Sequence, residues 1–145
     1  MNSVAKHLMS HGIRPSIQRI AIMQYLMGHA THPTVDTIYK DLHDDIPTLS
    51  RTTVYNTLAL LEEKNAMMSI TIDSHNVRYD GNANPHAHFQ CRKCGMIFDS
   101  ELNVTDLQNI KYPKGFDAQQ VQVFYYGTCG KCREKEAMEK GKQIN

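Results

Sequence analysis

Hydrophobic residues recur with a helical period over the first 64 residues of the chain. This pattern predicts four helices, at residues 4–11, 17–28, 34–43 and 51–64. Ser16 and Ser50 precede the second and fourth helices, where a serine hydroxyl can accept a hydrogen bond from a free backbone N–H group. The expected inward faces are Ile17, Ile20, Met23, Leu26 and Met27 in the second helix, Val35, Ile38, Tyr39 and Leu42 in the third, and Val54, Leu58 and Leu61 in the fourth.

After Asn65 the helical period gives way to strict alternation. Met68, Ile70 and Ile72 alternate with polar residues, and residues 77–80 follow a polar turn at 74–76. This pattern predicts a two-stranded hairpin. Helices followed by a hairpin within about 80 residues are typical of a winged helix-turn-helix domain.

The second half of the chain predicts a smaller unit of mixed structure. Residues 81–85, with the sequence Gly-Asn-Ala-Asn-Pro, are the expected linker. Beyond it we expect strands at 86–91, 96–99 and 119–126, and a helix at 102–111. We therefore predict an α+β protein with a winged helix-turn-helix domain at 1–82 and a small α/β domain at 83–145. The second domain is small enough that a bound metal would help it to fold.

Composition narrows the possible functions. The 145 residues carry a formal net charge of +1, with 7 basic and 8 acidic residues before position 83 and 9 basic and 7 acidic residues after it. If the protein binds DNA, its affinity must come from a few well-placed lysine and arginine side chains, whose number is doubled when two chains form a dimer. No apolar run approaches the roughly 18 residues that span a bilayer. We expect a cytoplasmic protein without a membrane partner.

Four cysteines form two pairs, Cys91-x-x-Cys94 and Cys129-x-x-Cys132. A gap of two residues allows both thiolates of a pair to face one tetrahedral centre, so two pairs predict a closed, structural zinc site. The alternatives are two disulfides or four free thiols. In a reducing cytosol zinc is favoured over disulfides.

A second candidate metal site begins with His86-Ala87-His88. On a strand, residues i and i+2 share one face roughly 6.6 Å apart, so both imidazoles can reach one ion. Asp80 and Asp99 flank the pair in sequence. Taken singly, each aspartate reads as a solvated carboxylate, and His32 reads as an exposed loop residue.

The fourth predicted helix is a candidate DNA-recognition helix. Thr52, Asn56 and Ala59 lie opposite its apolar stripe, Tyr55 lies at the side, and Arg51 lies at the start. An asparagine can bind adenine through two hydrogen bonds, and a methyl group can meet that of thymine. Arg51, Arg19 and Lys64 are suited to contact phosphate. An ordinary amphipathic helix would show the same pattern.

Motifs from both halves of the chain resemble the ferric uptake regulator family of metal-dependent repressors, in the same order. The matching segments are residues 12–19 around Gly12-Ile13-Arg14 and Gln18-Arg19, His32-Pro33-Thr34 with Ile38-Tyr39, residues 53–58, residues 86–91, Cys94-Gly95 and Cys129-x-x-Cys132. The resemblance implies a homodimer that binds an inverted-repeat operator in double-stranded DNA, with dimerisation and metal binding in the second domain. It assigns DNA contacts to Arg14, Arg19, Arg51, Thr52, Tyr55 and Asn56.

Within this family the chain most resembles the peroxide-sensing PerR branch. The resemblance implies a regulatory Fe(II) or Mn(II) site with the ligands His32, Asp80, His86, His88 and Asp99, beside the zinc site. Iron-sensing members typically carry Glu where this chain has Asp99, and they differ at Pro85, Thr128 and Asn56. Peroxide sensing is implied to proceed by Fe(II)-dependent oxidation of His32 and His86, which Mn(II) does not support.

These ligands are divided between the two predicted domains. A metal that holds all five would fix the angle between the winged helices of a dimer, which must reach major grooves about 34–36 Å apart or a multiple of that distance. Three alternatives remain at this stage: an iron-sensing repressor of iron-uptake genes, an iron enzyme, and a zinc-stabilised interaction module without DNA affinity.

Overall fold

The structure is a computed structural model that describes residues 2–143. It divides into two compact units between Asn84 and Pro85, within the segment that the sequence predicts as a linker. Each unit is described separately below. Across residues 2–143, no helix is both long enough and apolar enough to cross a membrane.

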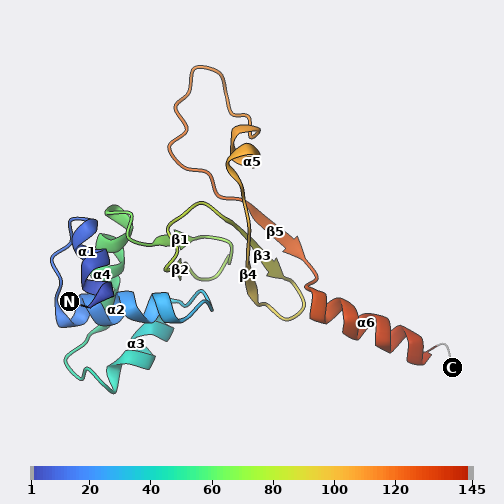
Figure 1. Ribbon diagram of the computed structural model, residues 1–145. Helices are drawn as coiled ribbons and strands as arrows, with labels where there is room; N and C mark the ends of the chain where they lie inside the picture. The colour runs from blue at the N-terminus through green and yellow to red at the C-terminus, as the bar shows by residue number, and fades with distance from the viewer. Residues whose placement is uncertain (1, 144–145) are drawn as a thin grey trace. The chain divides into compact units, whose positions relative to one another are not determined.

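The first unit contains four helices, which Figure 1 shows in blue to green. They are α1 (Ser3–Ser10), α2 (Ile17–Gly28), α3 (Val35–His43) and α4 (Arg51–Glu63). The predicted caps are confirmed, because the Ser16 side chain accepts a hydrogen bond from the Arg19 N–H group and the Ser50 side chain accepts one from Thr53. These caps fix where α2 and α4 begin.

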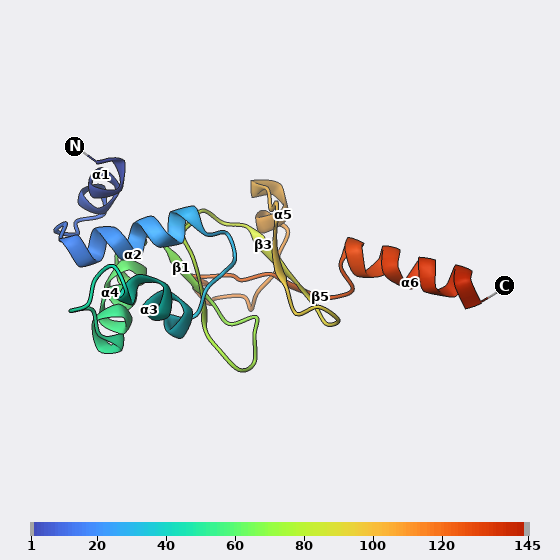
Figure 2. The ribbon, with the colours of Figure 1, turned by 90° about the horizontal axis from the view of Figure 1, so that it is seen from below.

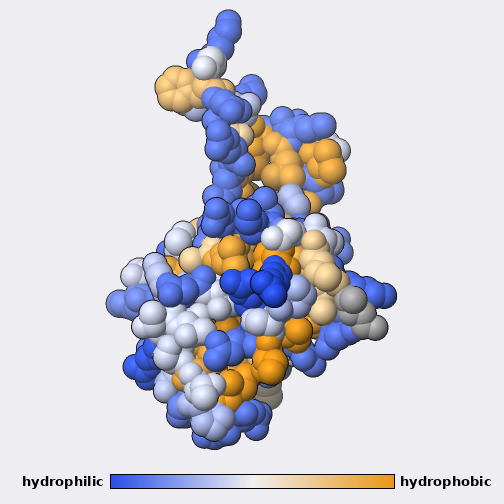
Figure 3. All heavy atoms as spheres, turned by 90° about the vertical axis from the view of Figure 1, so that its left-hand side faces the viewer, coloured by the Kyte–Doolittle hydropathy of each residue, from blue (hydrophilic) through white to orange (hydrophobic). Residues whose placement is uncertain are grey.

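The predicted inward faces of α3 and α4 are confirmed. Ile38 is fully buried, as are Val54, Leu58 and Leu61, and the rest of the α3 face is partly buried against the core, at Val35, Tyr39 and Leu42. The predicted face of α2 is partly wrong, since Ile17 and Met27 are 81% and 48% exposed while Ile22 and Tyr25 are buried. In Figure 3 polar residues cover much of the visible surface of this unit, with exposed hydrophobic residues between them.

The predicted hairpin is present as β1 (Met68–Ile70) and β2 (Arg78–Asp80). The two strands pair antiparallel, with Met68 opposite Asp80 and Ile70 opposite Arg78. The loop between the strands, residues 71–77, is called the wing loop below. Ile70, Ile72 and Tyr79 are buried, so the hairpin packs one face inward while the wing loop stays largely exposed.

The second unit is built on a three-stranded sheet of order β4-β3-β5. The strands are β3 (Ala87–Cys91), β4 (Ile97–Ser100) and β5 (Phe124–Gly127), with β3 antiparallel to β4 and parallel to β5. The helix expected at 102–111 is shorter, α5 (Val104–Gln108), and the expected strand at 119–126 is regular only in its last part. The sequence reading missed α6 (Gly130–Gln143), which continues from β5 as a separate helix (Figure 2).

Candidate metal centres and nucleic-acid interface

The four cysteines meet at one end of the second unit. Cys91 ends β3, Cys94 lies in the following turn, Cys129 directly precedes α6 and Cys132 lies in its first turn. Their sulfur atoms all lie within 4.8 Å of one another, and all four are free thiols rather than disulfides. The Cys94 and Cys129 sulfurs are 3.8 Å apart. Sulfurs that bind one tetrahedral zinc ion at about 2.3 Å are also separated by about 3.8 Å, so the cluster is suited to structural zinc.

The electrostatics of this cluster also fit a cation. The backbone N–H groups of Cys94 and Cys129 donate to the Cys91 sulfur at 3.5 and 3.3 Å, which lowers the pKa of the Cys91 thiol to about 6. The Cys132 thiol has its pKa raised to about 12, first by its hydrogen bond to Cys129 and then by burial. Four adjacent sulfurs cannot all ionise without a neutralising charge, and a bound metal ion supplies it.

In the first unit His32 and Asp80 form a buried pair. The His32 Nε2 atom lies 3.3 Å from the Asp80 Oδ2 atom, and the two residues are only 2% and 8% exposed. The prediction that His32 is an exposed loop residue, which rested on its sequence position alone, is therefore wrong. His32 precedes α3 and Asp80 ends β2, so the pair joins two segments that are 48 residues apart (80 − 32) in the sequence.

The second unit groups His86, His88 and Asp99. The Nε2 atoms of His86 and His88 lie 3.3 and 3.4 Å from the Asp99 Oδ1 atom, and the two imidazole ring centroids are 4.3 Å apart. His88 lies directly opposite Asp99 in the β3–β4 ladder, which places both side chains on the same face of the sheet. His86 precedes β3 and reaches the same carboxylate.

Both groups fit divalent-metal ligation by their chemistry and spacing. Each offers imidazole nitrogens and a carboxylate oxygen, the ligand types of Fe(II) and Mn(II) sites. Adjacent ligands on one octahedral ion, bound at about 2.1 Å, are about 3 Å apart, close to the 3.3–3.4 Å nitrogen–oxygen distances of these pairs. That the five residues of the two groups are metal ligands remains a prediction; they are His32, Asp80, His86, His88 and Asp99.

The residues predicted to contact DNA occupy two places in the first unit. Arg14, Arg19 and Asn56 line a single groove between the start of α2 and α4. Thr52, Tyr55 and Asn56 are all exposed on α4, so the face opposite its apolar stripe is accessible. Arg51 instead lies against α3, 5.1 Å from the Tyr39 ring centroid and 3.5 Å from an Asp36 carboxylate oxygen. An ion pair this exposed contributes little to stability, so Arg51 can leave it for a phosphate.

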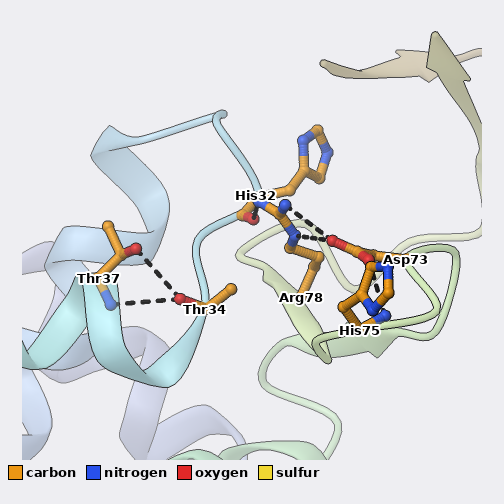
Figure 4. A network of polar contacts seen from close by, with 6 residues as sticks. All are labelled: His32, Thr34, Thr37, Asp73, His75 and Arg78. Atoms are coloured by element: carbon orange, nitrogen blue, oxygen red, sulfur yellow. Dashed lines mark hydrogen bonds and ion pairs between the residues drawn. The ribbon is translucent and has the colours of Figure 1, made fainter. Parts of the chain in front are cut away.

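Sequence reasoning missed one polar contact close to His32. Arg78 of β2 donates to the His32 carbonyl oxygen and to the Asp73 carboxylate (Figure 4). An aspartate and an arginine on either side of a predicted turn were the available signal, because oppositely charged residues flanking a hairpin loop can pair across it.

Known proteins of similar sequence and structure identify the family. The profile of the family described as "Ferric uptake regulator family" matches residues 10–126. The peroxide-responsive repressor PerR of Staphylococcus aureus is 33% identical over 126 residues, which are 86% of this chain and 85% of that protein.

Solved structures agree with this assignment. The peroxide-sensing regulator PerR of Streptococcus pyogenes is 31% identical, with a TM-score of 0.50 over 89% of this chain and 90% of that one. The ferric uptake regulator of Pseudomonas aeruginosa, solved with manganese, shares the fold at 18% identity, with a TM-score of 0.67 over 89% of this chain and 99% of that one. The chain belongs to the ferric uptake regulator family, whose members are metal-responsive, dimeric, DNA-binding transcription regulators.

Proposed function

We propose that the protein is a transcriptional repressor that senses hydrogen peroxide through a regulatory metal ion and derepresses oxidative-stress genes when its own histidine ligands are oxidised. The observation that supports this most is that His32 in the first unit, and His86 and His88 in the second, each hold an imidazole nitrogen 3.3–3.4 Å from a carboxylate oxygen. The similarity to peroxide-responsive repressors and the presence of aspartate at position 99 favour peroxide over iron as the signal.

In this proposal one Fe(II) or Mn(II) ion binds His32 and Asp80 of the first unit together with His86, His88 and Asp99 of the second. Three imidazoles and two carboxylates leave a sixth position of an octahedral ion for peroxide. Bound Fe(II) supplies the one-electron reduction of peroxide that generates an oxidant beside the ligands. The cysteine cluster holds a separate structural zinc ion that stabilises the second unit.

The role of the protein residues follows from their positions. His32 is almost fully buried beside Asp80, so its imidazole ring is held in place by the surrounding atoms. Oxidation would alter the size and the basicity of this ring. A damaged imidazole would bind the metal more weakly. The two units would then lose their common ligand set, and the dimer would release its inverted-repeat operator. A repressor of this kind works where its operator DNA lies, which agrees with the expected cytoplasmic location.

The central test combines metal binding and DNA binding. An operator is first selected from random double-stranded DNA with the Mn(II)-loaded wild-type protein. Mn(II) is then titrated into mixtures of this operator with wild-type protein or with the His32→Ala variant, and binding is followed by fluorescence anisotropy. We expect Mn(II)-dependent binding of the wild type and its loss in His32→Ala, while zinc content stays the same. Undiminished Mn(II)-dependent binding by His32→Ala would contradict the proposal.

A second comparison separates peroxide sensing from iron sensing. The Fe(II)-loaded wild type and an Asp99→Glu variant are exposed to micromolar peroxide, and operator release is measured. We expect the wild type to release DNA and the glutamate variant to be less sensitive, because iron-sensing members typically carry glutamate there. Wild-type protein that keeps its operator under peroxide but loses it on iron chelation would favour the iron-sensing function.

A further inference from the structure

The backbone of His32 adopts a conformation that its neighbours must support. Its φ angle is +55°, in the left-handed region that a residue with a Cβ atom adopts only at an energetic cost. The next residue is Pro33, which restricts the His32 backbone further. A buried histidine in this conformation keeps its position only if surrounding contacts over-determine it.

Two residues of β2 supply such contacts. The Arg78 Nη1 atom donates to the His32 carbonyl oxygen at 3.3 Å, and the Tyr79 backbone N–H group donates to the Pro33 carbonyl oxygen at 3.0 Å. The carbonyl groups of the left-handed residue and of the residue after it therefore both accept hydrogen bonds from the same strand. This strand ends at Asp80, the carboxylate partner of the His32 imidazole.

The Arg78 guanidinium is itself held by the wing loop. Its Nη2 and Nε atoms donate to the Asp73 Oδ2 atom at 2.9 and 3.2 Å, and the Asp73 Oδ1 atom accepts the His75 backbone N–H group at 2.9 Å. Figure 4 shows the guanidinium between the His32 carbonyl group and the Asp73 carboxylate. The pKa of the Asp73 carboxyl is lowered by the His75 N–H group first and by Arg78 second, so this carboxylate stays charged at neutral pH.

These hydrogen bonds form a continuous polar path within the first unit. It runs from the His75 N–H group through Asp73 and Arg78 to the backbone of His32. The side chains of Asp73 and Arg78 are only 11% and 26% exposed, so water competes weakly for their hydrogen bonds. Charge-assisted, partly buried contacts of this kind fix geometry more firmly than an exposed ion pair does.

We propose that Arg78 is a positioning residue that holds His32 in its ligand-presenting conformation and that, through Asp73, it couples the order of the wing loop to metal binding at His32. This inference rests on the proposed function, in which His32 is a regulatory metal ligand. Because coupling is reciprocal, a metal ion at His32 stabilises the wing loop to the same extent that an ordered wing loop stabilises metal binding.

The first test measures Mn(II) affinity of the full-length, zinc-loaded protein without DNA, by competition with a fluorescent chelator. Loss of a group that orients a metal ligand typically weakens metal binding 10–100-fold, so Arg78→Ala should weaken Mn(II) binding by about that factor. Arg78→Lys keeps the charge and should restore part of the affinity. Asp73→Asn should weaken binding less than Arg78→Ala.

Ser69→Ala is the matched control. The Ser69 hydroxyl donates to the Glu62 carboxylate at 2.5 Å, so this change removes a polar contact of the same hairpin that does not involve Arg78 or Asp73. It should leave Mn(II) affinity unchanged. Zinc content and the far-ultraviolet circular dichroism of each variant establish that the fold is retained, and Asp73→Asn and Arg78→Lys keep the test decisive if Arg78→Ala does not fold.

The second test follows hydrogen exchange of the backbone amides at 73–77 with and without Mn(II). In the wild type Mn(II) should slow exchange of the His75 amide, and in Arg78→Ala it should not. A purely structural role for Arg78 would raise exchange equally with and without the metal.

The outcomes distinguish the role proposed for Arg78 from the role proposed for His32 as a metal ligand. His32→Ala that loses Mn(II) binding while Arg78→Ala binds like the wild type would overturn this inference and leave the proposed function intact. His32→Ala with wild-type Mn(II) affinity would overturn both. Weakened binding in Arg78→Ala, with the wing-loop protection lost, would support the inference.

Discussion

Gly81 occupies a position where one added carbon atom should disturb the first unit. It follows Asp80 directly, at the end of β2, and packs against the last turns of α2. A Cβ atom at Gly81 would lie 2.9 Å from both the carbonyl carbon and the oxygen of Leu26, and 3.1 Å from the Met27 nitrogen. Ordinary contacts of this type are 3.4–4 Å long, and backbone atoms cannot rotate away as a side chain can.

We therefore expect Gly81→Ala to force β2 and α2 apart by a few tenths of an ångström. Overpacking of this kind costs about 1–3 kcal/mol. In a unit of 84 residues, each 1 kcal/mol of lost stability lowers the melting temperature by roughly 4–8 °C. Because Asp80 is the adjacent residue, the displacement should also weaken Mn(II) binding.

The matched control is Gly28→Ala, at the end of the same helix. A Cβ atom there meets nothing within 4 Å, and the residue lies in the helical region, so the substitution should be neutral or slightly stabilising, by about 0.4–1 kcal/mol. Urea unfolding followed by circular dichroism at 222 nm, with a parallel Mn(II) titration, measures both effects. Equal stability and equal Mn(II) affinity of Gly81→Ala and wild type would show that the close packing of Gly81 against α2 does not constrain the first unit.

Three further predictions concern the zinc cluster, the core and the DNA surface. Cys129→Ser should reduce zinc from about one ion per chain to near zero by elemental analysis and should speed proteolysis of the second unit; retained zinc would contradict the four-cysteine site. Burial and a hydrogen bond to Asp41 raise the pKa of Tyr25 to about 12, so its stabilising contribution should be complete below pH 10 and lost as the pH rises toward 12. Tyr25→Phe should lose less stability than wild type between pH 9 and 11, and equal losses would count against this. Asn56→Ala should cost about 1–3 kcal/mol of operator discrimination, whereas Arg14→Ala should lower the salt dependence of binding by about one phosphate contact; binding assays at several salt concentrations separate the two.

The features that the sequence predicts correctly depend on local patterns. Ser16 and Ser50 cap α2 and α4 because a serine before an apolar stripe supplies the missing hydrogen-bond acceptor. Within each Cys-x-x-Cys pair the two thiols face one centre because the pair needs only a tight turn. The serine caps and the spacing within each cysteine pair are local signals, whereas the pairing of β3 with β5 brings the two cysteine pairs together.

The features that the sequence does not predict either depend on contacts between residues far apart in the sequence or lack a periodic hydrophobic pattern. Ile17 is five residues from buried Ile22, about 140° around a helix, so its exposure depends on which side of α2 meets the core. Most of α6 is charged or polar, and Met138 in it is 66% exposed, so no apolar stripe marks this helix. His32 is buried and pairs with Asp80, which is far away in sequence, and a histidine before a proline does not by itself predict burial.

Mass spectrometry of the Fe(II)-loaded and Mn(II)-loaded full-length protein, before and after micromolar peroxide, asks most simply whether the histidine ligands are the peroxide sensor. Peroxide sensing through the histidine ligands should add one oxygen atom to the peptides that contain His32 or His86, in the iron form alone, together with loss of operator binding. Operator release by the iron form with both histidines unmodified, or equal oxidation of the manganese form, would contradict it.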